Sequence, residues 1–347
     1  MAHSDPRQSQ KSARRLATVA RRSTGFNPDK EIRIILIGKT GNGKSASANT
    51  ILNRKAFRSS TSPCSVTSEC EKARGKVNGY RLAVIDTPGI YDTKYKQDEV
   101  IRKLKECISL SAPGPHVFLI VVKLDRFTKE EQKTVELLQL VFGDKAAAYS
   151  LVLFTHGEQL RSTTIEDYCS QCAKLSNLIE KCNWRYHVFS NAAPDSRQVP
   201  QLLAKIRSMV RANGGTFYTN SMFQEAERAI RDQMKEIMQV SAEQKGREEE
   251  ILRAALQGEL LQEKLNWLDE KYERKAREKA EKKNKFIETG LIVTATEAGV
   301  LIGVAATTVG GPLCMGIGAV VGGVVGAVVG VLAPAAVKAL KKKCTIQ

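Results

Sequence analysis

The sequence has neither a signal peptide at its start nor a framework spacing among its eight cysteines. Secreted proteins that depend on disulfides show both features, so we expect this chain to work in a reducing cytosol. Cys169 and Cys172 form a Cys-x-x-Cys pair, but neither a second such pair nor a pair of histidines follows at zinc spacing. We therefore expect no metal there and interpret the two cysteines as one face of a helix.

The chain also lacks a basic stripe across its body, although its formal net charge is +17. The excess lies in residues 1–30, 274–285 and 338–343, with net charges of +5, +5 and +4, which leaves the rest about three charges from neutral. Basic ends indicate contact with acidic membrane lipid, whereas a nucleic-acid binder carries its charge on a folded face. We expect membrane lipid, and not nucleic acid, as a partner. Residues 1–30 are polar, which predicts a disordered arm or else a short basic helix on a membrane.

What the sequence does contain is a phosphate-binding loop directly after an apolar run, in IRIILIGKTGNGKS at residues 32–45. The apolar run predicts a buried strand, and the glycines allow the backbone to turn its N–H groups toward an anion. The helix that follows adds the positive end of its dipole. Lys44 is expected to reach the terminal phosphates, and the Ser45 hydroxyl to bind Mg²⁺. The loop therefore predicts binding of a nucleoside triphosphate.

From residue 31 onward, short apolar runs alternate with segments of helical spacing. After the first strand, the expected strands are residues 81–85, 116–124, 150–155 and 185–190, and the expected helices are residues 98–110, 129–142, 165–182 and 199–211. This alternation predicts an α/β fold, in which a doubly wound, mostly parallel sheet carries helices on both faces. Ligand loops then lie at the carboxyl ends of the strands, where the phosphate loop is found.

A second motif, DTPG at residues 86–89, ends the expected strand at residues 81–85. Asp86 can hold Mg²⁺ through water and the Gly89 N–H can contact a γ-phosphate, although these residue types also favour ordinary turns. Its place about forty residues after a phosphate loop favours a GTPase. GTPases of the Ras type carry a water-orienting Gln just past this Gly. Ile90 follows here instead, so unaided hydrolysis is expected to be slow.

A third motif, THGE at residues 155–158, ends another expected strand. A carboxylate can accept hydrogen bonds from both N–H groups on the guanine edge, which adenine does not offer. The usual GTPase pattern is Asn/Thr-Lys-x-Asp, so His156 and Glu158 depart from it at two positions. The His156 ring can stack on the base as the lysine stem usually does. The position of the motif favours guanine, although the tetrapeptide by itself also fits an ordinary loop.

Four stretches of the sequence resemble a single family: LIGKTGNGKSASANTIL, SVTSEC, DTPGIYDT and SAPGPHVFLIVVKLDRFTKEEQKTVELL. They are similar to the GTPases of immunity-associated proteins (IMAP), and the last stretch, residues 111–138, matches the box that sets this family apart from other small GTPases. The resemblance covers residues 32–212. It implies a Ras-like P-loop G domain that binds GTP or GDP with Mg²⁺ and dimerises or oligomerises through its nucleotide face. It also implies a role in immunity.

The resemblance further implies roles for individual residues. Ser59 is expected beside the nucleotide at the start of switch I, and Thr67 as the switch I threonine that senses Mg²⁺ and acts in catalysis with Lys44. Asn191 is expected as the last contact on the base side. The expected nucleotide-binding set is Gly38, Lys39, Thr40, Gly41, Asn42, Gly43, Lys44, Ser45, Ala46, Ser59, Gly89, His156, Gly157, Glu158 and Asn191, and the expected Mg²⁺ set is Ser45, Thr67 and Asp86.

Arg126 lies in the distinctive box, within LDRFT. In some members of the family an arginine at this position is thought to act across the dimer as a catalytic finger. Such a group can raise the rate of phosphoryl transfer by roughly 10³- to 10⁵-fold, which would offset the missing Gln. The alternative is a surface arginine at the start of a helix, and the sequence leaves both open.

Residues 213–285 are rich in Glu, Lys, Arg and Gln and predict a charged helical extension. A 4-3 spacing of apolar residues, interrupted by Gly246 and Gly258, predicts a helical seam. Its members are Ile230, Met234, Ile237, Leu261, Leu265, Leu268 and Tyr272. The heptads are too few to define a coiled-coil dimer. We expect the extension either to pack back on the G domain or to form a partly paired stalk.

Residues 286–337 are apolar and glycine-rich, and positions 298–337 hold no charge. A helix of that length would measure about 60 Å, twice the ~30 Å hydrocarbon core of a bilayer. We therefore expect two membrane spans, at about 289–309 and 313–337, divided by Gly-Gly-Pro at residues 310–312. The basic flanks place both ends of this hairpin in the cytosol. A single span over the second segment and a soluble buried helix pair are the alternatives.

Residues 338–347 form a polybasic tail that ends in Cys-Thr-Ile-Gln. Cys344, four residues from the end, with an aliphatic residue at the third place, fits a prenylation (CaaX) box beside lysines that strengthen membrane attachment. Prenylation of Cys344 requires a cytosolic tail and therefore the hairpin. Otherwise the lysines anchor the last span and Cys344 is incidental.

These features predict a GTP-binding protein at the cytoplasmic face of an intracellular membrane, integral or anchored through its C-terminal segment. The first hypothesis is a slow GTPase, forming GDP and phosphate, that acts as a switch or scaffold when GTP drives dimerisation. The second is a GTP-binding membrane scaffold that hardly hydrolyses. A membrane-shaping or channel-like protein that uses the glycine-rich hairpin is a third class.

Overall fold

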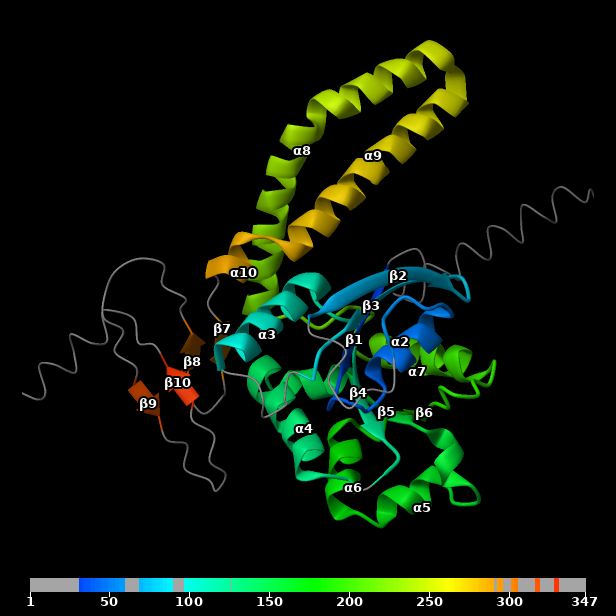
Figure 1. Ribbon diagram of the computed structural model, residues 1–347, viewed down its shortest axis with the longest axis vertical. Coiled ribbons are helices and arrows are strands. Elements are labelled where there is room, and N and C mark those ends of the chain that lie inside the picture. The colour runs from blue at the N-terminus through cyan, green and yellow to red at the C-terminus, as the bar shows by residue number, and fades with distance from the viewer. Residues whose placement is uncertain are drawn as a thin grey trace, which may run out of the picture. The chain divides into compact units, whose positions relative to one another are not determined.

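The structure is a computed structural model of the chain, and it describes residues 31–59, 69–89, 97–125 and 127–289, together with four short strands further on (Figure 1). The chain divides into two compact units. The first comprises residues 1–95 and 114–219, and the second comprises residues 96–113 and 220–347. The phosphate loop and both other nucleotide motifs fall in the first unit.

The first unit is built on a six-stranded sheet in the order β2-β3-β1-β4-β5-β6. Its strands are β1 (Ile32–Ile37), β2 (Glu71–Val77), β3 (Tyr80–Asp86), β4 (Val117–Lys123), β5 (Ser150–Thr155) and β6 (Tyr186–Val188). Neighbouring strands from β3 to β6 pair in parallel, and β2 pairs antiparallel with β3 at the edge. The expected α/β fold with a mostly parallel sheet is confirmed.

Helices cover both faces of this sheet, as the buried parallel strands require. They are α2 (Lys44–Leu52), α4 (Lys129–Phe142), α5 (Ile165–Ser170), α6 (Ala173–Lys181) and α7 (Gln198–Ala212), with short 3₁₀ helices η1 (Asp144–Tyr149) and η2 (Gly157–Leu160). Alternate residues of β4 face the two layers. Leu119 and Val121 pack with α2 and α7, whereas Ile120 and Val122 pack with α5 and α6. The core therefore lies on both sides of β4, at the centre of the sheet.

The apolar pattern does not predict β2, because its sequence, EKARGKV, is largely charged. The local signal for this strand is the Asn-Gly pair between β2 and β3. Asn78 and Gly79 have φ of 49° and 81°. Positive φ at both central residues is characteristic of a two-residue type I′ hairpin, which Asn-Gly favours. The hairpin pairs Val77 with Tyr80 and continues to the end of both strands.

Residues 165–182 do not form the single helix that their spacing predicts. α5 ends at Ser170 and α6 begins at Ala173, because Cys172 between them is extended, with φ −135° and ψ 102°. Cys169 and Cys172 therefore do not share one helix face, and that expectation is wrong. Both pack with the apolar layer of α5 and α6, and burial raises the pKa of the Cys169 thiol to about 11.

In the second unit the described helices are α3 (Gln97–Ser111), α8 (Ser221–Ala255), α9 (Gly258–Lys282) and α10 (Lys285–Thr289). α8 and α9 form an antiparallel hairpin that turns at Gly258, whose φ is 61° (Figure 1). α8 continues through Gly246 without a break. Ile230, Leu268 and Tyr272 of the predicted seam are buried in this unit. The apolar seam therefore includes buried residues of both α8 and α9, which belong to the same chain.

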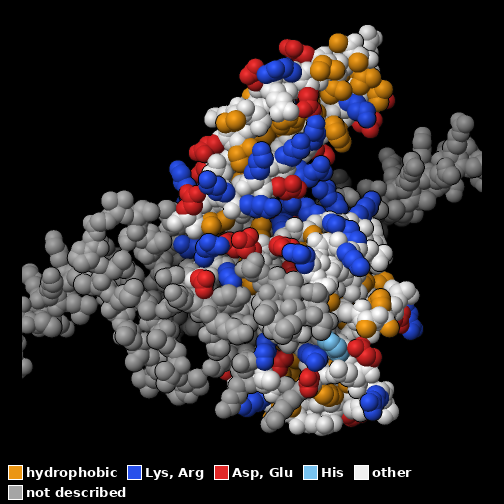
Figure 2. Space-filling view, in the orientation of Figure 1, with side chains coloured by type: hydrophobic (Ala, Val, Ile, Leu, Met, Phe, Trp, Pro, Cys, Tyr) orange, Lys and Arg blue, Asp and Glu red, His pale blue; other side chains and the backbone are white. Residues whose placement is uncertain are grey.

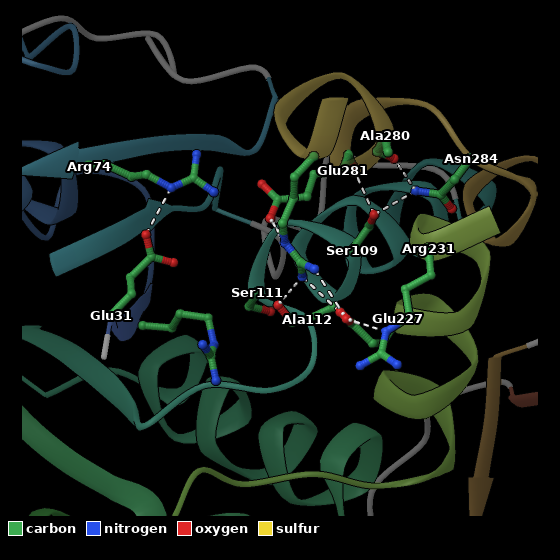
Figure 3. Close-up of polar contacts among 12 residues, drawn as sticks. Glu31, Arg74, Ser109, Ser111, Ala112, Glu227, Arg231, Ala280, Glu281 and Asn284 are labelled. Carbon is green, nitrogen blue, oxygen red and sulfur yellow. Dashed lines mark hydrogen bonds and ion pairs between the residues drawn. The ribbon is translucent and has the colours of Figure 1, made fainter. Parts of the chain in front are cut away.

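Buried polar contacts hold α3 against α8 and α9 within this unit (Figure 3). Arg277 Nη2 lies 2.7 Å from Glu227 Oε2. Ser109 Oγ donates to the Glu281 carbonyl at 2.7 Å and accepts from Asn284 Nδ2 at 2.8 Å. Because buried polar groups need partners, these bonds restrict how the three helices can pack.

The exposed side chains of the α8–α9 hairpin are mostly charged along its length and more hydrophobic near its turn. Charged side chains of both signs cover most of the visible face, whereas hydrophobic side chains gather at the closed end (Figure 2). Ile251 and Leu260, near that turn, are 67% and 50% exposed. The charged face agrees with the predicted helical extension.

Within the apolar residues 286–337 the structure describes short strands in place of the expected helices. β7 (Ile292–Ala295) pairs antiparallel with β8 (Leu301–Val304), and β9 (Gly316–Gly318) pairs with β10 (Val328–Gly330). The physical reason is that Ile, Val and Thr favour strands and glycine disfavours helices. Among the described residues, no helix is both long enough and apolar enough to cross a bilayer. The tail with Cys344 lies outside the described residues.

Candidate nucleotide-binding site

The phosphate loop leaves β1 and enters α2 at Lys44. Gly41 and Gly43 have φ of 85° and 84°, a left-handed conformation that a side chain would strain. Gly38 lies so close to β4 that an added Cβ would stand 2.5 Å from the Val121 carbonyl oxygen. Glycine is therefore required at these three positions for the loop to curl between the ends of β1 and β4.

Lys44 folds back over this loop. Its Nζ donates to the carbonyl oxygens of Gly38 and Lys39, at 2.9 Å in each case, and the residue is 6% exposed. The ammonium group adds its charge to the positive N-terminal end of α2. This combination favours a polyanionic ligand such as a chain of phosphates.

Ser45 and Asp86 meet where α2 begins and β3 ends. The Ser45 hydroxyl donates to Asp86 Oδ2 at 2.5 Å, and Asp86 is 1% exposed. The other oxygen, Asp86 Oδ1, is buried without a hydrogen-bond partner among the described residues. Burial raises the pKa of Asp86 to about 6, although the Ser45 hydrogen bond and the Lys44 charge lower it.

A hydroxyl beside a buried carboxylate with one unsatisfied oxygen fits a hard divalent cation. Mg²⁺ prefers oxygen ligands and is usually held by one or two carboxylates together with phosphates and water. A cation here would also reduce the cost of burying the Asp86 charge. Ser45 and Asp86 therefore fit the Mg²⁺ that accompanies a nucleoside triphosphate.

The turn after Asp86 touches the phosphate loop. An added Cβ on Gly89 would stand 2.1 Å from Thr40 Oγ1, so glycine alone fits there. Thr87 Oγ1 donates to the Leu36 carbonyl at 2.7 Å and ties the turn to β1. Thr40 Oγ1 is buried and has no partner within the part of the chain that the structure describes. A phosphate oxygen at this place would satisfy the Thr40 hydroxyl.

The base-side motif follows β5. His156 is left-handed, with φ 61°, and its Nδ1 lies 3.1 Å from Thr155 Oγ1. Ser190 Oγ donates to Glu158 Oε2 at 2.7 Å, and this hydrogen bond is the main reason that the pKa of Glu158 is lowered. The exposed Glu158 carboxylate is therefore ionised at neutral pH and can accept hydrogen bonds from a ligand with paired N–H donors.

Asn191, on the loop after β6, contacts the helix that follows the phosphate loop. Its Nδ2 donates to Ser47 Oγ at 3.0 Å, and its Oδ1 accepts from Thr50 Oγ1 at 2.9 Å. Both ends of the side chain are thus engaged by α2. In this structure Asn191 joins the base-side loop to the phosphate-loop helix.

Beside this contact lies a hollow of about 730 Å³. Ala46 and Asn49 of α2, Ser59 and Asn191 are among the residues that line it. Asn49 Nδ2 lies 3.3 Å from Ser59 Oγ. The volume falls within the range of roughly 300–1,000 Å³ that small-molecule sites occupy.

The structure brings most of the sequence-predicted site residues to one edge of the sheet. The phosphate loop, the 86–89 turn, the 156–158 motif and Asn191 follow the carboxyl ends of β1, β3, β5 and β6, which run in parallel. Thr67 and Arg126 lie outside the described residues, so their expected roles remain predictions.

Several residues outside the predicted set contact it. Thr155, which the sequence indicates only as part of the THGE motif, donates through Oγ1 to the Asn42 carbonyl at 2.9 Å. Glu131 and Ser190 were not singled out from the sequence: Glu131 Oε1 accepts from Asn42 Nδ2 at 2.9 Å, and Ser190 Oγ donates to Glu158. Thr128-x-x-Glu131 is a capping-box pattern that predicts the start of a helix, but it does not predict the contact with the phosphate loop.

Comparisons with known proteins give a matching family model and several related sequences. The sequence model of the AIG1 family matches residues 32–238. Immune-associated nucleotide-binding protein 9 of Arabidopsis thaliana is 37% identical over 227 residues, which cover 62% of this chain and 66% of that protein. GTPase IMAP family member 8 of Homo sapiens is 31% identical over 194 residues, which cover 55% of this chain and 29% of that protein. The matches span less than two thirds of the length of these relatives.

Among solved structures, Toc33 from Arabidopsis thaliana in complex with GDP and Mg²⁺ is similar over 62% of this chain and 96% of that one. The sequence identity is 17% and the TM-score is 0.44. At this level the likeness carries no inference about function.

Proposed function

The chain belongs to the AIG1 family and carries its GTP-binding G domain, and from this premise we propose that it is a membrane-associated molecular switch. It binds GTP with Mg²⁺, dimerises or oligomerises through its nucleotide face, and hydrolyses GTP slowly or with help in trans. The observation that carries the proposal is the Ser45–Asp86 contact at the phosphate loop, with Asp86 Oδ1 buried and unpartnered among the described residues.

Guanine as the base is supported by the ionised Glu158 carboxylate, which Ser190 holds after β6. Two acceptor oxygens match the two N–H donors of the guanine edge, and adenine would leave them unpaired. A relative named as a nucleotide-binding protein and another named as a GTPase support the same class of ligand.

Slow hydrolysis is supported by Ile90, which stands where GTPases of the Ras type carry the Gln that orients the attacking water. When the nucleotide faces of two copies meet, Arg126 of one copy stabilises the transition state of GTP hydrolysis in the other. This contribution offsets the missing Gln. In each copy Lys44 supplies positive charge at the terminal phosphate, and the neutral Thr67 would contribute its hydroxyl to Mg²⁺.

Membrane attachment is supported by the exposed lysines at the end of α9, directly before the apolar residues 286–337. They include Lys275, Lys279, Lys282 and Lys283. Acidic lipid attracts such residues by about 1 kcal/mol each near the surface. The apolar segment and a prenylated Cys344 supply the stronger anchor, so the protein acts at the cytoplasmic face of an intracellular membrane.

The test is equilibrium binding of fluorescent GTP, GDP and ATP to the full chain, with and without Mg²⁺. We expect guanine nucleotides to bind about a hundredfold more tightly than ATP, and Mg²⁺ to increase the affinity for GTP. Lys44→Ala is expected to lose at least about tenfold in affinity, because a charged phosphate contact is removed. Equal affinity for ATP and GTP would contradict the proposal.

A second candidate is a GTP-binding scaffold that does not hydrolyse, which Ile90 in place of Gln also favours. Single-turnover phosphate release at increasing protein concentration separates the two. A rate that rises with concentration, and that Arg126→Ala abolishes, supports trans activation. Retention of GTP at every concentration supports the scaffold. A membrane-shaping or channel-like role would be indicated if Lys44→Ala left localisation and activity unchanged.

A further inference from the structure

A buried carboxylate outside the three nucleotide motifs contacts the phosphate loop. Glu131 lies at the third residue of α4 and is 6% exposed. Its Oε1 accepts a hydrogen bond from Asn42 Nδ2 at 2.9 Å. Asn42 is itself 5% exposed. The two side chains therefore form a buried hydrogen bond between α4 and the phosphate loop.

Asn42 ties the middle of the phosphate loop to neighbouring elements of the unit. It stands between Gly41 and Gly43, whose left-handed backbones leave the chain there without restraint from side chains of their own. Asn42 Nδ2 also donates to the Val121 carbonyl at 2.9 Å, and Thr155 Oγ1 donates to the Asn42 carbonyl at 2.9 Å. The shape of the loop between its two glycines therefore depends on the partners of one residue.

The second carboxylate oxygen of Glu131 takes part in capping the N-terminus of α4. Oε2 accepts from the Thr128 N–H at 2.8 Å, and the Thr128 hydroxyl in turn accepts from the Glu131 N–H at 3.4 Å. This capping box accounts for one carboxylate oxygen. Oε1 is not part of the cap and faces the phosphate loop instead. The two oxygens thus make separable contributions, one to the helix and one to the loop.

We propose that Glu131 is a positioning residue for nucleotide binding: through Asn42 it holds the phosphate loop in the conformation that receives the phosphates. Glu131 does not touch the nucleotide itself. Loop N–H groups can bind an anion without reorganisation only when the loop is held in advance, so releasing Asn42 lowers affinity. The inference rests on the proposed binding of GTP and adds a determinant from α4, within the sequence box that distinguishes the chain from other small GTPases.

The experiment measures the affinity of the full chain for fluorescent GDP and its melting temperature without nucleotide. The variants are Glu131→Ala, Asn42→Ala, the double variant and Thr128→Ala, with Glu136→Ala as the matched control. Glu136 is an exposed acid on the same helix that accepts from Gln132 Nε2. We expect each of Glu131→Ala and Asn42→Ala to weaken binding by about tenfold, and the double variant to be no weaker than either.

Thr128→Ala separates positioning from helix stability, because it removes a partner from the cap and leaves the Asn42 contact in place. We expect it to lower the melting temperature while GDP affinity stays within about threefold of wild type. If Thr128→Ala weakens binding as much as Glu131→Ala, or if the two tenfold losses multiply in the double variant, the inference is wrong. Glu136→Ala is expected to change neither quantity.

Two further outcomes separate this inference from the proposed function. A wild type that binds no guanine nucleotide would overturn the proposed function and this inference with it. A wild type that binds, together with a Glu131→Ala variant of equal affinity, would overturn this inference alone. If Glu131→Ala does not fold, Asn42→Ala decides, because it leaves the cap of α4 intact: an affinity equal to that of wild type would overturn the inference.

Discussion

Asp86 has opposite effects on folding and on ligand binding. Its carboxylate is 1% exposed, and one of its oxygens has no partner among the described residues. Burial therefore raises its pKa from 3.8 to about 6. At neutral pH the protein holds a buried charge that destabilises the nucleotide-free state and that a divalent cation would stabilise.

We expect Asp86→Asn to stabilise the protein without nucleotide and Mg²⁺ at pH 8, by about 1–3 kcal/mol. The folded state of the wild type binds the Asp86 proton more tightly than the unfolded chain. This group therefore favours folding below about pH 4 and loses that contribution as the pH rises to about 6. Thermal unfolding at pH 8 and pH 4 is the measurement, and the difference between variant and wild type should vanish at pH 4.

The same variant is expected to lose the effect of Mg²⁺ on nucleotide affinity, because the amide carries no charge to attract the cation. Asp195→Asn is the matched control, since Asp195 is exposed and pairs with Arg197. It should change neither the unfolding at pH 8 nor the Mg²⁺ effect. An Asp86→Asn variant that is less stable than wild type at pH 8 would show that the buried Asp86 charge does not destabilise the nucleotide-free protein.

Glu158 is expected to determine the choice of base. Glu158→Gln replaces one acceptor oxygen by a donor, so one N–H of guanine meets an N–H of the protein. We expect the affinity for GDP to fall by about tenfold or more, with little change for ATP. Competition of unlabelled nucleotides against fluorescent GDP measures both. Ser190→Ala, which removes the hydroxyl that holds Glu158, should have a smaller effect in the same direction.

At the scale of elements, the helices of the second unit depend on one guanidinium. Arg277 of α9 donates to Glu227 of α8 and lies 3.0 Å from Glu281, whose side chain is 1% exposed. Removing Arg277 takes the buried cationic partner from two carboxylates whose side chains are only 12% and 1% exposed. We expect Arg277→Ala to lower the free energy of unfolding by about 3–5 kcal/mol, measured by urea denaturation.

The control for this prediction lies on the neighbouring helix. Arg231 pairs with the same Glu227 at 3.0 Å, but its side chain is 70% exposed. Arg231→Ala should change the free energy of unfolding by less than about 1 kcal/mol, because exposed ion pairs contribute little. Equal effects of the two arginine variants would show that burial of the pair is not what stabilises these helices.

Two glycines, one in a hairpin turn and one in a helix, are expected to respond to alanine with opposite signs. Gly79 has φ 81° in the turn between β2 and β3, so Gly79→Ala should destabilise the protein by about 1 kcal/mol or more. Gly246 lies inside α8, and an added Cβ would meet nothing within 4 Å. Gly246→Ala should stabilise it by about 0.5–1 kcal/mol. Thermal unfolding of both variants checks the prediction, and a stabilising Gly79→Ala would contradict the turn type.

At the scale of the whole molecule, charge and apolar content are separated along the chain. The basic residues 274–285 precede the apolar residues 286–337, and the polybasic tail follows them. Electrostatic attraction to lipid is screened by salt, whereas burial of apolar surface is not. These two contributions can therefore be measured separately on one protein.

We expect the full chain to float with vesicles that contain acidic lipid and to remain bound in part at 0.5 M salt, where the Debye length is only about 4 Å. Deletion of residues 286–347 should leave binding that high salt abolishes. Neutral vesicles are the control for the basic segment. Complete release of the full chain by salt would contradict an anchor formed by the apolar residues.

Much of the first unit could be predicted because its signals are local. The expected strands correspond to β3, β4, β5 and β6, since each is a short apolar run between turn residues. The charged strand β2 could not be found from apolar alternation and is indicated only by Asn78-Gly79. The break at Cys172 has no signal in the helical spacing, and the strands within residues 286–337 reflect β-branched residues that the apolar pattern had assigned to helices.

By itself, the sequence determined the phosphate loop, the DTPG turn and the family, because each depends on residues that are neighbours in the chain. Only the tertiary structure decided that Asn42 binds Glu131, 89 residues away, that Asn191 binds Ser47, 144 residues away, and that Ser109 binds the Glu281 carbonyl, 172 residues away. These contacts follow from the order of strands in the sheet and from the packing of helices, and local spacing encodes neither. The residues that bind phosphate are therefore evident in the chain, whereas the residues that hold them in position become evident in the fold.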